Sequence, residues 1–251
     1  MNAEISRLWP RPAAQIDDDS ILETYAFPDG PWLRMNFVSS IDGAATRDER
    51  SGELGGDADR RMFELLRRQA DVILVGAGTV RVEGYGAMRL RDDAVTWRVA
   101  HGMSEHPSFA LVSGSLDLDP ESDVFTAAPN RPIIYTVEAA PHDRRESLRA
   151  VADVIDAGSE TLVPAAVRED LVARGLHHVH SEGGPRVFGT FIADGAVDEV
   201  CLTLASSLEA GDAGRISHSP QAAPTGMDLT AILKADREIF LRCVRAQEEH
   251  D

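Results

Sequence analysis

Short apolar runs alternate with segments of helical periodicity from Leu33 onwards. Apolar positions recur at helical spacing in 57–69, 142–149, 165–174 and 186–193. Runs typical of strands occupy 33–40, 72–75, 109–112, 133–137, 151–155, 176–180 and 200–204. Because strands covered on both faces read as short continuous apolar runs, the alternation predicts an α/β fold with a mostly parallel sheet.

The two ends of the chain depart from this alternation. Residues 1–30 contain Pro and acidic residues with little periodicity, so we expect an N-terminal arm that lies on the domain or is partly disordered. Two short strand patterns between 229 and 244 predict a C-terminal antiparallel hairpin at one edge of a mixed sheet. The segment 86–107 reads as a long loop or insertion. We therefore predict one domain over residues 31–251 after the arm.

Charge and composition limit the classes of partner. The net charge of −17 argues against a nucleic-acid or anionic-membrane surface, although local arginines can still hold a small anionic ligand. Only Cys201 and Cys243 are present, and the histidines of 177–180 lack a complete ligand set, so we expect neither disulfides nor a metal site. With no apolar stretch of membrane-spanning length, a soluble cytoplasmic protein is expected.

Glycine pairs follow two of the predicted strands. Gly183 and Gly184 stand between a strand and a helix, and Gly76 and Gly78 precede Thr79 in the same position of another unit. Ligands of open α/β sheets gather beyond the carboxyl ends of strands, where bare N–H groups and a helix N-terminus attract phosphates. The two segments are interpreted as one site for an elongated anion. Tight turns that cap helices are the alternative.

Several polar residues near these turns are candidates for chemistry. Asp42 follows the first core strand, where Asp-Gly is equally explained as a hairpin turn. Glu83 lies one helical turn after Thr79, and Arg67 and Arg89 can clamp a phosphate; solvated surface positions are the alternative for all three. Ser113 ends a strand and is either an anion contact or an ordinary turn residue.

Three segments together resemble the riboflavin-biosynthesis pyrimidine reductase family, the reductase half of the bifunctional deaminase/reductase. They are residues 37–43, 70–80 and 181–185, in the order of the family, and the resemblance runs from about Leu33 to about Arg245. It implies a dihydrofolate-reductase-like three-layer fold and a homodimer. It also implies NADPH-dependent reduction of 5-amino-6-(5-phosphoribosylamino)uracil to the ribitylamino product.

The resemblance also assigns roles to individual residues. Glu83 and Asp42 are the candidate catalytic residues. The expected contacts to NADPH are Val38, Gly76, Thr79, Glu83, Ser113, Gly183, Gly184, Pro185, Arg186, Val187, Phe188 and Gly189. The expected contacts to substrate are Ser51, Arg67, Arg89 and Glu182. No arginine near Ser113 in the sequence marks a 2′-phosphate site, so the preference for NADPH comes from the resemblance.

Departures from the family pattern leave other functions open. The proline expected after the Glu83 position is absent, Arg89 fits only with a one-residue slip, and Glu53 and Leu54 stand where a tryptophan is usual. These positions line the substrate side. Reduction of a dihydropterin such as dihydrofolate is therefore an alternative, as are a non-catalytic NADP-binding protein and a purely structural α/β domain.

Overall fold

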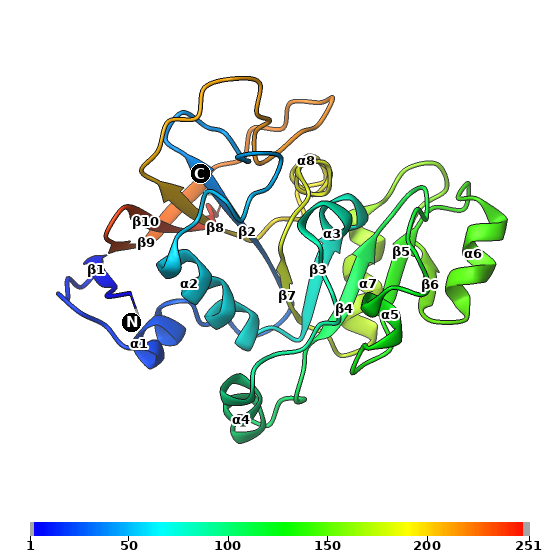
Figure 1. Cartoon of the computed structure of the whole chain (residues 1–251), viewed down its shortest axis with the longest axis horizontal. Helices are drawn as coiled ribbons and strands as arrows, with labels where there is room; N and C mark the ends of the chain where they lie inside the picture. The colour runs from blue at the N-terminus through cyan, green and yellow to red at the C-terminus, as the bar shows by residue number, and fades with distance from the viewer. Residues whose placement is uncertain (1–2, 248–251) are drawn as a thin grey trace.

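The computed structural model describes residues 3–247 (Figure 1), so residues 1–2 and 248–251 of the predicted arm and domain lie outside the described residues. The strands are β1 (Ser6–Trp9), β2 (Trp32–Ser40), β3 (Val72–Gly76), β4 (Ser108–Val112), β5 (Ile133–Thr136), β6 (Asp153–Asp156), β7 (His178–Ser181), β8 (Glu199–Ala205), β9 (Met227–Ala235) and β10 (Glu238–Arg245). The helices are α1 (Asp18–Thr24), α2 (Asp57–Arg68), α3 (Ala77–Glu83), α4 (Asp92–Ala100), α5 (Asp123–Thr126), α6 (His142–Arg149), α7 (Pro164–Ala173) and α8 (Pro185–Ala193).

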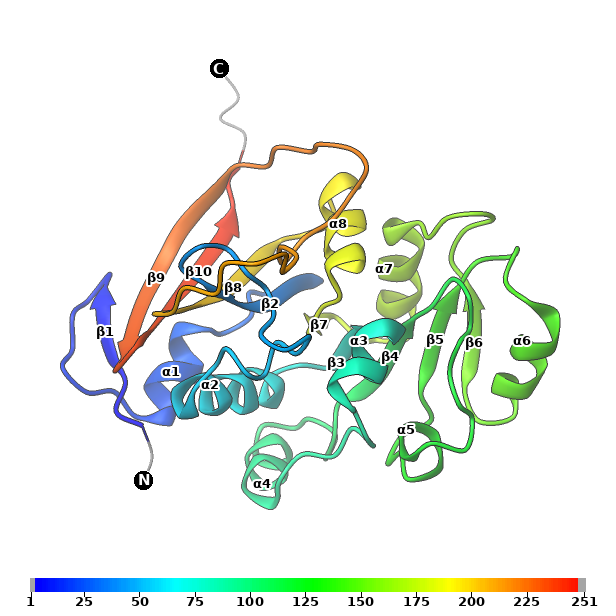
Figure 2. The same cartoon turned by 45° about the horizontal axis from the view of Figure 1, so that its top comes forward.

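All of these strands belong to one sheet, in the order β1-β9-β10-β8-β2-β7-β3-β4-β5-β6. The strands from β8 to β6 in this order are parallel, whereas β10 is antiparallel to β8 and β9, and β1 is antiparallel to β9. The β9–β10 hairpin lies at one end of the molecule, and β5, β6 and α6 lie at the other (Figure 2). The predicted mostly parallel sheet with a terminal antiparallel hairpin is confirmed.

Helices cover both faces of the sheet and give three layers. Alternate residues of the central strands point to opposite faces, as the pleat requires. Leu74 packs in the cluster that contains residues of α7 and α8, while Ile73 and Val75 pack with residues of α3, α5 and α6. Helices α1 and α2 cover β8, β9 and β10. The core therefore consists of a buried sheet between two helical layers.

The N-terminal segment is more regular than its sequence predicts. β1 pairs with β9, and α1 buries Ile21 and Leu22 against a cluster that includes α2. The segment 86–107, expected as a loop or insertion, contains α4. Its Arg98 is fully buried and donates to the carbonyl oxygens of Arg68 and Ala70. A buried arginine at a packing position conceals the apolar periodicity on which helix prediction depends.

A buried ion cluster fixes the end of the N-terminal segment to the sheet. Glu199 accepts from Arg34 at 2.8 Å and from Arg242 at 2.9 Å. Arg34 also donates to the carbonyl oxygen of Tyr25, and Arg242 donates to those of Thr24 and Ala26. Although burial opposes it, the two guanidinium groups lower the pKa of Glu199 to about 2. The arm is thus held through charged hydrogen bonds to its backbone.

The sequence predicts neither a membrane span, nor a metal site, nor a disulfide. Within residues 3–247, no helix combines the length and apolar character needed to cross a bilayer. The same residues contain no group of three potential metal-ligating side chains, and both cysteines are free thiols.

Candidate active site

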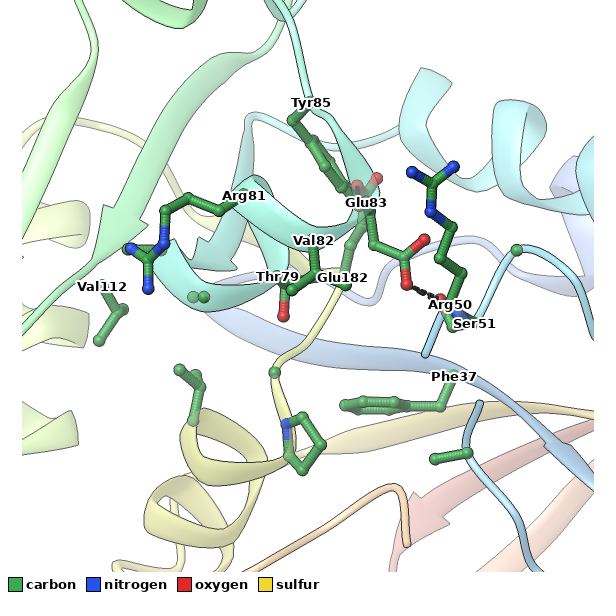
Figure 3. A pocket seen from close by; sticks show the side chains of 18 of the residues that line it. Phe37, Arg50, Ser51, Thr79, Arg81, Val82, Glu83, Tyr85, Val112 and Glu182 are labelled. Atoms are coloured by element: carbon green, nitrogen blue, oxygen red, sulfur yellow. Dashed lines mark hydrogen bonds between the residues drawn. The ribbon is translucent and has the colours of Figure 1, made fainter. Parts of the chain in front are cut away.

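A cleft of about 1180 Å³ opens at the carboxyl ends of β3, β4 and β7 (Figure 3). Its walls come from α2, α3, the start of α8 and the loop of residues 45–53, and β2 forms part of its floor. Most of the residues predicted to bind cofactor or substrate line it. They are Val38, Ser51, Arg67, Gly76, Thr79, Glu83, Ser113, Glu182, Gly184, Pro185, Arg186 and Val187.

The two glycine turns are in direct contact. The N–H of Gly76 donates to the carbonyl oxygen of Gly183 at 2.9 Å. A Cβ atom on Gly184 would lie 3.2 Å from the Thr79 hydroxyl, and one on Gly76 would lie 3.0 Å from Val187. Gly184 also has φ of +95°, a conformation that favours glycine. The turns that the sequence predicts as one site are therefore adjacent.

The first turn of α8 has free capacity for an anion. No side chain caps this nine-residue helix, and Pro185 at its start has no N–H. The N–H groups of the first turn have no partner within the helix, and the helix dipole places partial positive charge there. Together with the bare backbone of Gly76 and Gly184, this end of the cleft fits the pyrophosphate of a dinucleotide.

Phe37 forms the floor beside the glycine turn. Its ring stacks on Phe188 with centroids 4.7 Å apart, and a Cβ atom on Gly183 would lie 2.8 Å from it. Phe188 is buried, and Gly189 packs so closely on His218 that a Cβ atom would collide with its carbonyl oxygen. Gly183, Phe188 and Gly189 thus lie behind the cleft lining and shape it through packing.

A charged group occupies the end of β7. Glu182 accepts from both Nε and Nη2 of Arg67, the second at 2.6 Å, and from the Tyr85 hydroxyl at 2.9 Å. Burial alone would lower the pKa of Arg67, but the Glu182 carboxylate outweighs burial and raises this pKa. Burial raises the pKa of the Tyr85 hydroxyl. The fully buried His180 lies 3.9 Å from Glu182, and burial, with help from Arg34, lowers its pKa. Glu182 is therefore a fixed acceptor of hydrogen bonds beside a neutral imidazole.

Glu83 closes the cleft from α3. One of its carboxylate oxygens accepts from the Ser51 N–H at 2.7 Å and from the Ser51 hydroxyl at 2.8 Å (Figure 3). This contact ties the 45–53 loop to α3 across the cleft. The second carboxylate oxygen makes no hydrogen bond to any residue in 3–247, which leaves it free to contact a ligand.

Besides Gly183, Phe188 and Gly189, two predicted residues lie outside the cleft lining. Asp42 is exposed and accepts from the Ser40 hydroxyl and from the N–H groups of Glu209 and Ala210, which lower its pKa to about 2, with Ser40 the largest contribution. These contacts fit the turn interpretation. Arg89 is outside the cleft lining and donates to the carbonyl oxygen of Ala127 at 3.2 Å.

The sequence reasoning missed several residues that the fold brings into the cleft. Arg50 extends from the 45–53 loop on the side of Glu83, and Arg81 of α3 points toward the end of β4 near Val112 (Figure 3). Other lining residues that were not predicted include Asn36, Phe37, Asp59, Phe63 and Tyr85. Helical spacing supplied one signal, because Asp59, Phe63 and Arg67 recur every four residues along α2.

Comparison with known proteins places this geometry in a family. The family model of the RibD C-terminal domain matches residues 31–241. The 2,5-diamino-6-ribosylamino-4(3H)-pyrimidinone 5′-phosphate reductase of Methanothermobacter thermautotrophicus is 29% identical over 184 residues, covering 72% of this chain and 80% of the relative. The riboflavin biosynthesis protein RibD of Mycobacterium tuberculosis is 29% identical over 183 residues, covering 72% of this chain and 44% of the relative.

A solved structure supports the same relationship. A pyrimidine reductase-like protein of Corynebacterium diphtheriae superposes with a TM-score of 0.82 at 28% identity, covering 91% of this chain and 99% of that chain. The three-layer architecture, the sheet order and this similarity confirm the predicted dihydrofolate-reductase-like fold.

Proposed function

The chain belongs to the RibD C-terminal domain family, and from this membership we propose that it is the NADPH-dependent pyrimidine reductase of riboflavin biosynthesis. Its substrate class is the 5-amino-6-(5-phosphoribosylamino)pyrimidines, which include the uracil predicted from the sequence, and its product carries a ribitylamino group. The relatives favour this reading over a dihydropterin reductase and over a protein without catalysis. The expected homodimer and cytoplasmic location are part of the proposal.

One observation carries this proposal. A single cleft joins a backbone cradle for phosphates, at Gly184 and the first turn of α8, to a set of fixed polar side chains, at Glu83 and Glu182. A reductase must hold a coenzyme and a second molecule side by side, so that the reacting carbons meet. A cleft with two chemically different halves meets that requirement.

Arg81 supports the choice of NADPH over NADH. It lines the cleft with Ser113 and Ser115, and its guanidinium donates to the carbonyl oxygen of Asp117 at 2.5 Å. An arginine and two hydroxyl groups at the end of β4 fit the 2′-phosphate of NADPH, which NADH lacks. When bound, the coenzyme supplies the hydride; the remaining steps depend on the protein's own side chains.

The reaction adds a hydride to the sugar C1 carbon and a proton to the ring oxygen. As the C1–H bond forms, the bond between C1 and the ring oxygen breaks, and its electron pair stays on the oxygen that takes the proton. Glu83 is proposed to position the water or substrate hydroxyl that delivers this proton, since its second oxygen is free. Arg50 and Arg67 are proposed to hold the 5′-phosphate.

The experiment is an assay of the purified protein with NADPH and each candidate substrate. We expect loss of NADPH absorbance with a phosphoribosylamino-pyrimidine, and a ribitylamino product that has gained two hydrogen atoms by mass spectrometry. Consumption of NADPH with dihydrofolate alone would overturn the proposal in favour of a pterin reductase. Tight NADPH binding without turnover of any substrate would overturn it in favour of a non-catalytic protein.

A further inference from the structure

One face of α2 runs along the substrate half of the cleft. Asp59, Phe63 and Arg67 are spaced by four residues, lie on the same side of the helix and all line the cleft. Successive members of this row are about 6 Å apart along the helix axis, close to the width of a pyrimidine ring. The Arg67 guanidinium lies 4.2 Å above the Phe63 ring, at the end next to Glu182. Asp59 therefore stands at the opposite end of this row.

The Asp59 carboxyl group destabilises the folded protein when it is ionised. The pKa of Asp59 is raised to about 6, mainly by burial and further by the negative charge of Glu238. A hydrogen bond with the Thr203 hydroxyl lowers the pKa, but by less than burial raises it. Glu238 caps the start of α2 by accepting from the N–H groups of Gly56 and Asp59, the latter at 3.1 Å. Within residues 3–247, Asp59 forms no ion pair, although the exposed Asp57 beside it pairs with Arg60. Only the Thr203 hydroxyl and the charge of Arg60 lower the Asp59 pKa, and together they do not offset burial.

The other inner carboxylates of the cleft are already engaged. Glu182 is neutralised by Arg67, and Glu83 is held by Ser51. The Asn36 side chain of β2 also lines the cleft and makes no hydrogen bond to another described residue. Asp59 therefore offers a carboxylate beside the Phe63 ring, on which an aromatic heterocycle would stack, and Asn36 offers a second polar group in the same cleft.

The pyrimidines of this substrate class differ in the edge that they present. The form named for the Methanothermobacter relative has an amino group at C2 beside N3–H, which gives two parallel donors. The uracil form has a carbonyl group at C2 instead. A carboxylate accepts from two parallel donors at once, but its lone pairs repel a carbonyl oxygen. An asparagine in the same place accepts from N3–H and donates to the carbonyl group.

We propose that Asp59 is a specificity-determining residue that reads position 2 of the pyrimidine, so that the 2-amino form is reduced in preference to the uracil form. This inference rests on the proposed function and names the substrate within its class. Asp59 accepts from the 2-amino group and N3–H, Phe63 stacks on the ring, and Asn36 meets a remaining polar edge. The reacting sugar then extends toward Glu83 and the coenzyme half of the cleft.

The test compares kcat/KM for the two pyrimidines in the wild-type protein, Asp59→Asn and Asp57→Asn. Loss of one hydrogen bond to a charged group corresponds to roughly a 10- to 100-fold change in binding. We expect the wild type to prefer the 2-amino form by at least about 10-fold, and Asp59→Asn to reverse the preference. Asp57→Asn is the matched control, since the Asp57 side chain is 77% exposed on the same helix and does not line the cleft.

The outcomes separate this inference from the proposed function. Turnover of either pyrimidine by the wild type preserves the proposed function. An equal loss of activity on both pyrimidines in Asp59→Asn, or an unchanged ratio of the two kcat/KM values, would overturn the role of Asp59. A wild-type preference for the uracil form would overturn it as well. Thermal unfolding of each variant establishes that the comparison is between folded proteins.

Discussion

The pKa of Asp59 makes a quantitative prediction about stability. Its value of about 6 in the folded protein exceeds the unperturbed 3.8, so the folded state binds the proton more tightly than the unfolded chain. Protonation of Asp59 therefore adds to the free energy of unfolding. The added free energy is complete below about pH 4 and is lost as the pH rises through about 6. About two pKa units at about 1.4 kcal/mol each give about 3 kcal/mol. Partial exposure of the side chain reduces this to about 2 kcal/mol.

Above about pH 6, the ionised Asp59 carboxylate destabilises the folded state, and Asp59→Asn removes this destabilisation. For a chain of this size, about 2 kcal/mol corresponds to a rise in Tm of about 4–8 °C. We expect that rise near pH 8 and almost none near pH 4, measured by differential scanning calorimetry against the wild type. Asp57→Asn should give no such pH-dependent gain, because hydrogen bonding to Arg60 lowers the Asp57 pKa. A Tm for Asp59→Asn that is unchanged or lower near pH 8 would refute the reasoning.

Five further substitutions test the remaining assignments. Arg50→Ala should raise KM for the phosphorylated substrate by roughly 10- to 100-fold, whereas Arg89→Ala, outside the cleft, should leave it unchanged; equal effects would contradict the placement of the phosphate. Arg81→Ala should raise KM for NADPH by a similar factor and leave KM for NADH unaltered, and a parallel change in both would remove Arg81 from the 2′-phosphate site. Glu83→Gln should lower kcat more than NADPH affinity measured by titration, and normal turnover would exclude it from proton delivery. Glu199→Gln should destabilise the fold by about 3–5 kcal/mol, because it leaves two buried guanidinium groups without a carboxylate. The kcat of the folded variant should be unchanged. Unfolding of the variant at the same denaturant concentration as the wild type would contradict this expectation.

The sheet was predictable where one physical signal dominated. β3 reads as a continuous apolar run because it is buried on both faces, and β9 and β10 read as strands around a short turn. Prediction failed where tertiary contacts replaced local periodicity. β1 is four residues long and is stabilised by pairing with β9, which lies more than two hundred positions away along the chain. No local pattern encodes that partner.

The site divides in the same way. Gly76 and Gly184 could be predicted because two turns that approach each other closely need residues without a Cβ atom, and glycine is visible in the sequence. Arg81 was missed because its proximity to Ser113 arises from the packing of α3 beside β4, and an arginine on a helix usually lies in solvent. Asp59 was missed for a similar reason, since its cost depends on burial by the sheet and on Glu238 of β10.

The strong negative charge of the chain does not conflict with two anionic ligands in one cleft. Arg67 neutralises Glu182, so this carboxylate presents little free charge to an incoming phosphate, and Ser51 fixes one oxygen of Glu83 in place. The groups proposed to bind the phosphates are guanidinium groups and backbone N–H groups at the ends of the cleft, and the walls of a cleft strengthen the field of such groups. Asp59 is the exception, and it lies at the end of α2 where the heterocycle carries no phosphate. Its uncompensated carboxylate is therefore tolerable for binding only if the ring presents donors to it, which is the property that distinguishes the 2-amino pyrimidine.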